Sequence, residues 1–185
     1  MLLVVYNSLD RQKLKDHILL PYNFNSHWIL IIIDIDRSHV TVFDSLRTDP
    51  KEYQDVQETL DIAWREFIRV DRSSQFKEKL TWRTDFPCLR QEPGNDNLCG
   101  YYVCQHMHNL LGPKTIKATE HEFKMWNIQW GLLKKERVAA ICEGLIGFLV
   151  DEVVNSQGDF PLRWTKIRCS HHLDGKIIVD IYSLI

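Results

Sequence analysis

Three residues in distant parts of the sequence have the side chains that thiol-dependent hydrolysis requires. His27 stands at the start of an apolar run, and Asp44 follows the next apolar run seventeen residues later. Cys99 lies in NLCGYYVCQH, directly after a stretch rich in Pro, Gly and Asn. A carboxylate that accepts a hydrogen bond from an imidazole fixes its tautomer, and the second ring nitrogen can then act as a base. These residue types predict a His–Asp–Cys site, provided that the fold brings them together.

His27 and Asp44 flank a predicted β-hairpin. HWILIII (27–33) is a run of strand length, and HVTVFDS (39–45) follows after a short polar break. Two such strands indicate an antiparallel pair. Opposed residues in such a pair have a constant sum of residue numbers, and the value of 71 for His27 and Asp44 places the turn inside the polar break. Both side chains are therefore expected at one end of the sheet, where cross-strand Cβ atoms lie about 4.5–5.5 Å apart.

Cys99 is predicted to begin a helix that runs to about Leu111. The unpaired N–H groups and the dipole at a helix N-terminus stabilise a thiolate, and an adjacent imidazolium acts in the same direction. Gly100 leaves the flank of the nucleophile open to a substrate backbone. Gln91, eight residues upstream, is a candidate donor to the oxyanion that forms when a thiolate attacks a carbonyl, beside the backbone N–H of Cys99.

The order and spacing of these motifs resemble the Ulp/sentrin-specific cysteine protease family. The likeness rests on HW, on FDS seventeen residues after the histidine, and on RQEPGN followed by LCGYYVC, and it covers about residues 15–155. It is strongest to the Ulp-like protease domains of plant transposon-derived genes. The resemblance implies an α+β, papain-like cysteine protease fold of the adenain/Ulp type, with a central mixed or antiparallel sheet flanked by helices.

The resemblance also implies a role for each matched residue. His27 is the base, Asp44 orients it, and Cys99 is the nucleophile. Gln91 is the oxyanion donor, and Trp28 matches one of two tryptophans that cover the narrow channel for the diglycine. The implied partner is a SUMO-like modifier or its conjugates, cleaved after the C-terminal Gly-Gly without a cofactor, in the nucleus or cytoplasm.

The chain is predicted to hold one protease domain over residues 1–155 and an appendage of unknown role over residues 156–185. Only 26 residues precede His27, whereas family domains carry a longer N-terminal section that supplies the second tryptophan and much of the substrate groove. The domain is therefore expected to be short at its N-terminus. An alternative hypothesis is a catalytically inactive relic that keeps the fold and binds a modifier without cleaving it. The sequence leaves the choice of modifier and the oligomeric state open.

Composition argues against several other classes of function. The 185 residues carry 23 Lys plus Arg and 25 Asp plus Glu, so no basic excess points to nucleic acid. The longest apolar run, residues 28–33, is far below the roughly 20 residues of a membrane span. Five cysteines cannot all pair, and their spacing forms no secreted-type framework, so a reducing intracellular compartment is expected.

A metal site is the main competing interpretation of the cysteine-rich segment. Donor atoms that zinc accepts are present at Cys99, Cys104, His106 and His108. On one helix, however, Cys104 and His108 share a face while His106 points away. The segment also lacks C-x2-C and H-x3-H spacing, so neither a metal nor a cofactor is expected.

Hydrophobic periodicity predicts the remaining elements. A short helix is expected over residues 12–20, ending at Pro21, and a strand near residues 80–84. A longer helix behind Asp49 and Pro50 has one apolar face, made of Val56, Leu60, Ala63, Trp64, Phe67 and Ile68. The helix predicted over residues 135–154 has the clearest apolar stripe, which we expect to face the core. Residues 114–130 give no clear pattern.

Overall fold

The computed structural model describes residues 2–15, 17–71, 76–92, 98–111, 132–155 and 157. At its centre is a mixed sheet in the order β1-β2-β3-β4. β1 (Ile18–Phe24), β2 (His27–Asp34) and β3 (His39–Phe43) are antiparallel, and β4 (Thr81–Arg83) runs parallel to β3.

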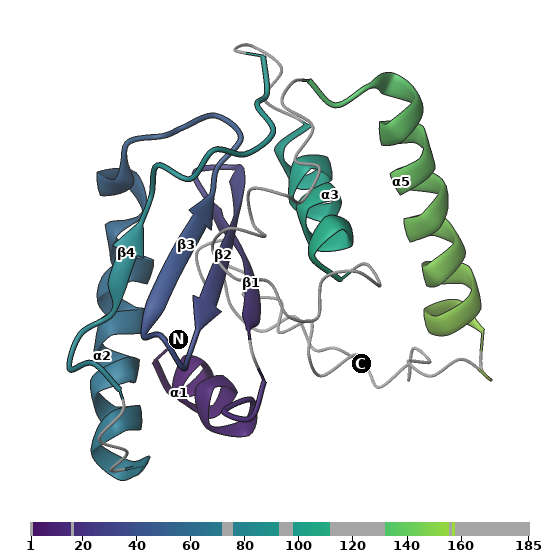
Figure 1. Cartoon of the computed structure of the whole chain (residues 1–185). Coiled ribbons are helices and arrows are strands. Elements are labelled where there is room, and N and C mark those ends of the chain that lie inside the picture. Colours follow the sequence, from purple (N-terminus) through teal and green to yellow (C-terminus); the bar gives the residue numbers. More distant parts are fainter. Residues whose placement is uncertain are drawn as a thin grey trace.

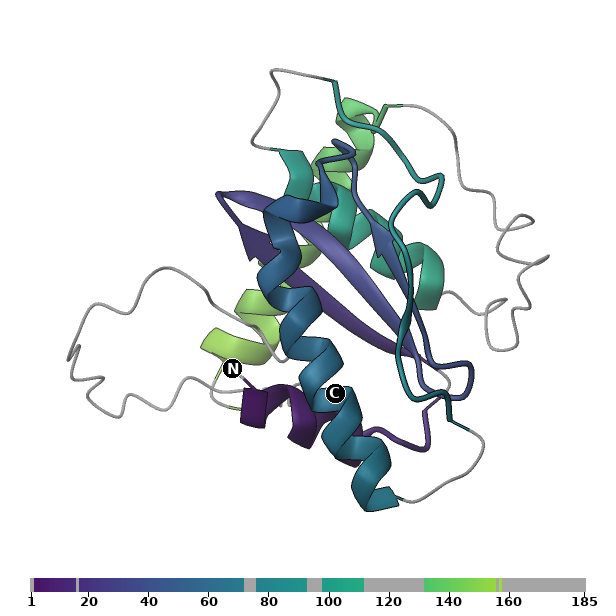
Figure 2. The same ribbon diagram turned by 90° about the vertical axis from the view of Figure 1, so that its left-hand side faces the viewer.

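Helices cover both faces of this sheet, and the structure confirms the expected α+β architecture. One face packs against α1 (Leu2–Arg11) and α2 (Gln54–Asp71), and the other against α3 (Cys99–Leu111). α5 (Lys135–Phe148) lies outside α3, so that α3 separates it from the sheet (Figures 1 and 2). Two shorter helical segments complete the described part, η1 (Pro50–Tyr53) before α2 and η3 (Leu149–Val154) after α5.

β2 lies inside the sheet because its side chains are apolar on both faces. Ile29, Ile31 and Ile33 pack into the cluster under α1 and α2, whereas Leu30 and Ile32 pack on the α3 side. All five are at most 3% exposed. This alternation follows from the two-residue period of a strand, and it explains why the uninterrupted apolar run predicts a fully buried strand.

The pairing of β2 with β3 confirms the predicted hairpin, with a different register. Leu30 opposes Phe43, and Ile33 opposes Val40, so the constant sum is 73 and not 71. A shift of two residues preserves the face on which each side chain lies. His27 still opens β2, and Asp44 still follows β3 directly, so both remain at the same end of the sheet.

The segment before β2 corrects one prediction. The helix expected over residues 12–20 is absent: α1 ends at Arg11, and residues 18–24 form β1. Ile18, Tyr22 and Phe24 are buried against the α2 side. Pro21 pairs with Leu30 and lies within the strand, which is tolerated because β1 is at the edge of the described sheet and Pro lacks an N–H to donate. Pairing with β2 decides the conformation of residues 18–24, and this pairing cannot be predicted from the local sequence pattern.

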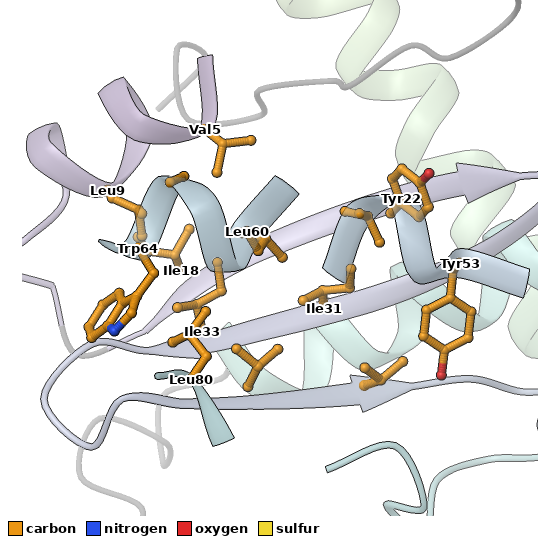
Figure 3. Close-up of a cluster of buried hydrophobic side chains, with 14 of the residues drawn as sticks. Val5, Leu9, Ile18, Tyr22, Ile31, Ile33, Tyr53, Leu60, Trp64 and Leu80 are labelled. Carbon is orange, nitrogen blue, oxygen red and sulfur yellow. The ribbon is translucent and has the colours of Figure 1, made fainter. Parts of the chain in front are cut away.

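The helix predicted behind Asp49 and Pro50 is confirmed. The Asp49 carboxylate accepts a hydrogen bond from the N–H of Lys51 over 3.0 Å and so caps η1, from which α2 continues. Leu60 and Trp64 are fully buried and lie in the cluster that joins α1, α2 and the sheet (Figure 3). The strand expected near residues 80–84 is also confirmed, as β4.

The predicted C-terminal helix is confirmed, but its expected packing is wrong. α5 and η3 together cover residues 135–154, yet neither contains a buried residue. Ile146 and Leu149 are 60% and 50% exposed. α5 contacts α3; for example, Cys142 Sγ lies 3.4 Å from the hydroxyl of Tyr101. Residues 114–130 and, apart from Gln157, the predicted appendage over residues 156–185 lie outside the described residues.

Candidate active site

His27 and Asp44 form a buried hydrogen-bonded pair. The distance from His27 Nε2 to Asp44 Oδ1 is 2.8 Å, and the two side chains are 10% and 3% exposed. The Asp44 carboxylate also accepts hydrogen bonds from the N–H groups of Leu46 (2.9 Å) and Thr48 (2.6 Å). The turn after β3 therefore fixes the carboxylate, and the carboxylate in turn fixes the imidazole. Because Nε2 bonds to Asp44, Nδ1 is the ring nitrogen left for chemistry.

The Cys99 sulfur lies against the backbone on both sides of His27. The N–H of Trp28 donates to Sγ over 3.3 Å, and Sγ is 4.0 Å from the carbonyl oxygen of Ser26. Cys99 is the first residue of α3, where free N–H groups favour a thiolate. The structure thus brings together a thiol from α3, an imidazole from β2 and a carboxylate from the end of β3.

The pKa values of these three groups are displaced in the directions that an ion pair requires. Burial would lower the pKa of His27, but the hydrogen bond to Asp44 and the nearby Cys99 sulfur raise it to about 9. Burial would raise the pKa of Cys99, but the imidazole and the N–H groups of Trp28 and Gly100 hold it below its usual value. Burial would also raise the pKa of Asp44, but the imidazole and two backbone N–H groups lower it. These displacements stabilise a thiolate beside an imidazolium relative to a neutral thiol beside a neutral imidazole.

Two aromatic side chains form a wall behind His27. The Phe24 ring meets the imidazole edge-on, with centroids 5.4 Å apart, and Tyr53 lies 5.3 Å behind Phe24. Phe24 pairs directly with His27 across the β1–β2 turn. Neither aromatic is predicted from the sequence as part of the site. Phe24 lies three residues before His27, a spacing that places the two opposite each other in a tight hairpin. This spacing predicts the contact only if residues 18–24 are recognised as a strand.

Gln91 is buried beside the residue that follows Asp44. Its N–H donates to the carbonyl oxygen of Ser45 over 2.9 Å, and the Ser45 hydroxyl donates to Gln91 Oε1 over 3.3 Å. Because the Ser45 hydroxyl donates to Oε1 of Gln91, the side-chain NH2 of Gln91 is the end of the amide left to donate. Gly100 adjoins Trp28: a Cβ placed on Gly100 would lie 3.8 Å from the Trp28 Cδ1, an ordinary contact distance.

The residues of the alternative metal site have other surroundings. His106 is buried edge-on against the Phe43 ring at 5.0 Å, and burial lowers its pKa to about 4. Cys99 contacts the backbone around His27. Across the described ranges, no group of three or more His, Cys, Asp and Glu side chains could hold a metal ion. Among the helices of those ranges, none combines the length and apolar character needed to cross a membrane.

Comparison with known proteins agrees with this geometry. Residues 8–141 match the model of the Ulp1 protease family, C-terminal catalytic domain. Over 108 residues the chain is 26% identical to sentrin-specific protease 3 of Mus musculus and to that of Homo sapiens. The matched part is 58% of this chain but only 18% of the length of each relative. The likeness to plant transposon-derived domains is not tested by these relatives and stays a prediction.

Proposed function

Because the chain belongs to the Ulp1 protease family, we propose that it is a cysteine peptidase that cleaves after the C-terminal Gly-Gly of a SUMO-like modifier. Members of this family have the papain-like cysteine protease fold, which is the fold class predicted from the sequence. The observation that supports the activity best is the contact of the Cys99 sulfur with the backbone N–H of Trp28, directly after His27, whose Nε2 is bound by Asp44. We assign the activity to the domain predicted over residues 1–155.

The first half of the proposed reaction forms a thioester. The Cys99 thiolate attacks the carbonyl carbon of the terminal glycine, and the carbonyl electron pair moves onto oxygen. The N–H of Cys99 and the side-chain amide of Gln91 donate to this oxyanion. When the oxyanion collapses, the C–N bond breaks and the His27 imidazolium gives its proton to the leaving lysine amine.

The second half releases the modifier. His27 takes a proton from water, which attacks the thioester carbonyl, and the thiolate leaves as a free carboxylate forms. Asp44 holds Nε2 throughout, so that Nδ1 serves both as base and as acid. Trp28 and Gly100 border the path of the diglycine in this proposal, since they adjoin each other and both lie next to Cys99. These steps need no cofactor.

Labelling with a modifier that carries a C-terminal electrophile tests the proposal. The unaltered chain should form a covalent adduct, and Cys99→Ala should form none. Cys104→Ala is the matched control, because it removes a half-buried thiol from the same helix and should leave labelling intact. A folded chain that binds a modifier but forms no adduct with any of several modifiers would instead favour the inactive relic.

A further inference from the structure

A separate pocket lies at the end of the strands remote from His27. Its volume is about 610 Å³, within the roughly 300–1,000 Å³ of small-molecule sites. A strand rises about 3.3 Å per residue, so the seven steps from His27 to Asp34 place about 23 Å between the two ends of β2. The polar side chains that line the pocket include Asp34, Arg37, His39, Thr41, Lys77 and Arg83.

The strand register creates this pocket. Ile32 opposes Thr41, which lies beside Arg83, and Asp34 opposes His39. Because side chains alternate between faces, these residues form two neighbouring rows on the face that also carries α3. The pocket is thus a regular consequence of the register of β2, β3 and β4.

The lining is positively charged. Among the described lining residues, Arg37, Lys77 and Arg83 stand against one carboxylate, that of Asp34, a balance of +2 with histidine neutral. Both oxygens of Asp34 accept hydrogen bonds from Arg37, one from the backbone N–H and one from Nη1, each at 2.9 Å. The single negative charge is therefore compensated inside the pocket, and a concave wall of this sign attracts anions.

One wall of the pocket is aromatic. Phe86 is 8% exposed and stacks on Phe43 with centroids 4.6 Å apart. The Arg83 guanidinium lies 4.9 Å from the centre of the Phe86 ring. Trp82 also borders the pocket, and its indole N–H donates to Asp61 over 3.1 Å. A guanidinium positioned over one ring can stack with a second ring on its other side.

We propose that this pocket binds a small phosphorylated molecule with a planar ring, of the nucleoside monophosphate class. The phosphate pairs with Lys77 and Arg37, and the ring stacks on the layer formed by Arg83 and Phe86. A ring alone does not engage the positive charge of Lys77 and Arg37, and a phosphate alone does not stack on Arg83, whose Nε also lies 3.7 Å from the Asp85 carboxylate. The proposal does not depend on the peptidase activity, because the pocket and Cys99 are at opposite ends of the sheet.

Calorimetric titration of the full chain with AMP, adenosine and inorganic phosphate tests the proposal. AMP should bind, and adenosine and phosphate should each bind at least roughly tenfold more weakly. Added salt should weaken AMP binding, because the contacts are between charges. Lys77→Gln should weaken it at least about fivefold, whereas Lys79→Gln, the same charge change two residues away and outside the lining, should stay within about twofold.

Three results would overturn the proposal. The first is no heat at about 10 mM AMP, together with unchanged NMR signals of the Thr41 and Arg83 backbone amides. The second is equal binding of AMP and phosphate, which indicates an adventitious ion only. The third is an equal loss in Lys77→Gln and Lys79→Gln, with thermal melts showing both folded. Cys99→Ala should bind AMP as the unaltered chain does, which separates this site from the proposed active site.

Discussion

Cys88 and Cys99 are both 3% exposed, yet their surroundings act in opposite directions. Burial and the nearby Asp44 carboxylate raise the pKa of the Cys88 thiol to about 11. Cys99 is equally buried, but the His27 imidazole and two backbone N–H groups lower its pKa. Exposure alone therefore does not distinguish the proposed nucleophile, Cys99, from Cys88; the neighbouring charges and donors do.

We predict that near neutral pH iodoacetamide alkylates Cys99 before Cys88, because only the thiolate reacts. His27→Ala should slow the alkylation of Cys99 at least about tenfold. It should leave the alkylation rate of Cys88 unchanged, since the imidazole is not among the groups that set the pKa of the Cys88 thiol. A time course of peptide mass spectra measures both rates in one sample. Equal rates for the two thiols in the unaltered chain would contradict the assignment of Cys99 as the thiolate.

The pH dependence of the proposed activity follows from His27. Its pKa is raised to about 9, so the imidazolium is present at neutral pH and is lost as the pH rises through about 9. We therefore expect kcat/KM to fall on that alkaline side. Asp44→Asn removes the carboxylate that raises this pKa, so the alkaline limb should move to lower pH and the rate should fall at least about a hundredfold. An alkaline limb that stays in place in Asp44→Asn would count against the role of Asp44.

The residues of the candidate site could be located from the sequence, whereas the residues that support them could not. His27, Asp44 and Cys99 stand out because their order, spacing and flanking patterns are unusual for core residues. Phe24 and Tyr53 are apolar rings in buried positions, which is what ordinary core filling also looks like. Their place behind the imidazole depends on strand pairing, a non-local contact that residue type does not encode.

At the scale of elements, the helices whose apolar residues follow a single helical periodicity are predicted with nearly correct boundaries. The helix predicted from Cys99 to about Leu111 agrees with α3, and the helix behind Asp49 agrees with η1 and α2. β1 was missed because its seven residues include Pro21 and Asn23 and have no clear alternation. Its conformation comes from pairing with β2, so tertiary contacts override a weak local preference.

The core side of α2 should be much more sensitive to truncation than its outer side. Trp64 is fully buried, lies against Phe67 and Phe76, and donates its indole N–H to the carbonyl oxygen of Lys77 over 3.0 Å. Trp64→Ala should lower the free energy of unfolding by about 3–5 kcal/mol. Ile62→Ala, on the same helix but 40% exposed, should cost below about 1 kcal/mol.

Urea unfolding of the two α2 variants supplies the comparison, and Trp64→Phe refines it. The phenylalanine keeps an aromatic ring in the cluster but leaves the Lys77 carbonyl without its donor. It should therefore cost less than Trp64→Ala, on the order of 1–3 kcal/mol. If Ile62→Ala lowered the free energy of unfolding as much as Trp64→Ala does, this would contradict the assignment of Trp64 to the buried face of α2 and of Ile62 to its exposed face.

At the scale of the whole molecule, the candidate site lies between two separately packed layers. His27 and Asp44 belong to the sheet, which the larger cluster ties to α1 and α2. Cys99 belongs to α3, which a smaller cluster around Leu30, Phe43 and Val103 holds on the other face. The arrangement of these layers, like the parallel placement of β4, could not be predicted from the sequence. Both depend on contacts between residues far apart in the chain.

The outermost layer is α5, and it should open more easily than the rest of the described fold. None of its residues is buried, and its contacts run through α3: the N–H of Leu133, just before it, donates to the hydroxyl of Tyr102 over 3.0 Å. Few buried apolar contacts mean a small free energy of local opening. In native-state hydrogen exchange, amides of α5 should therefore exchange well before those of α2 and β2, which should open only with global unfolding. Equal protection of α5 and α2 would show that the apolar stripe of α5 is covered in solution, as the sequence pattern alone had predicted.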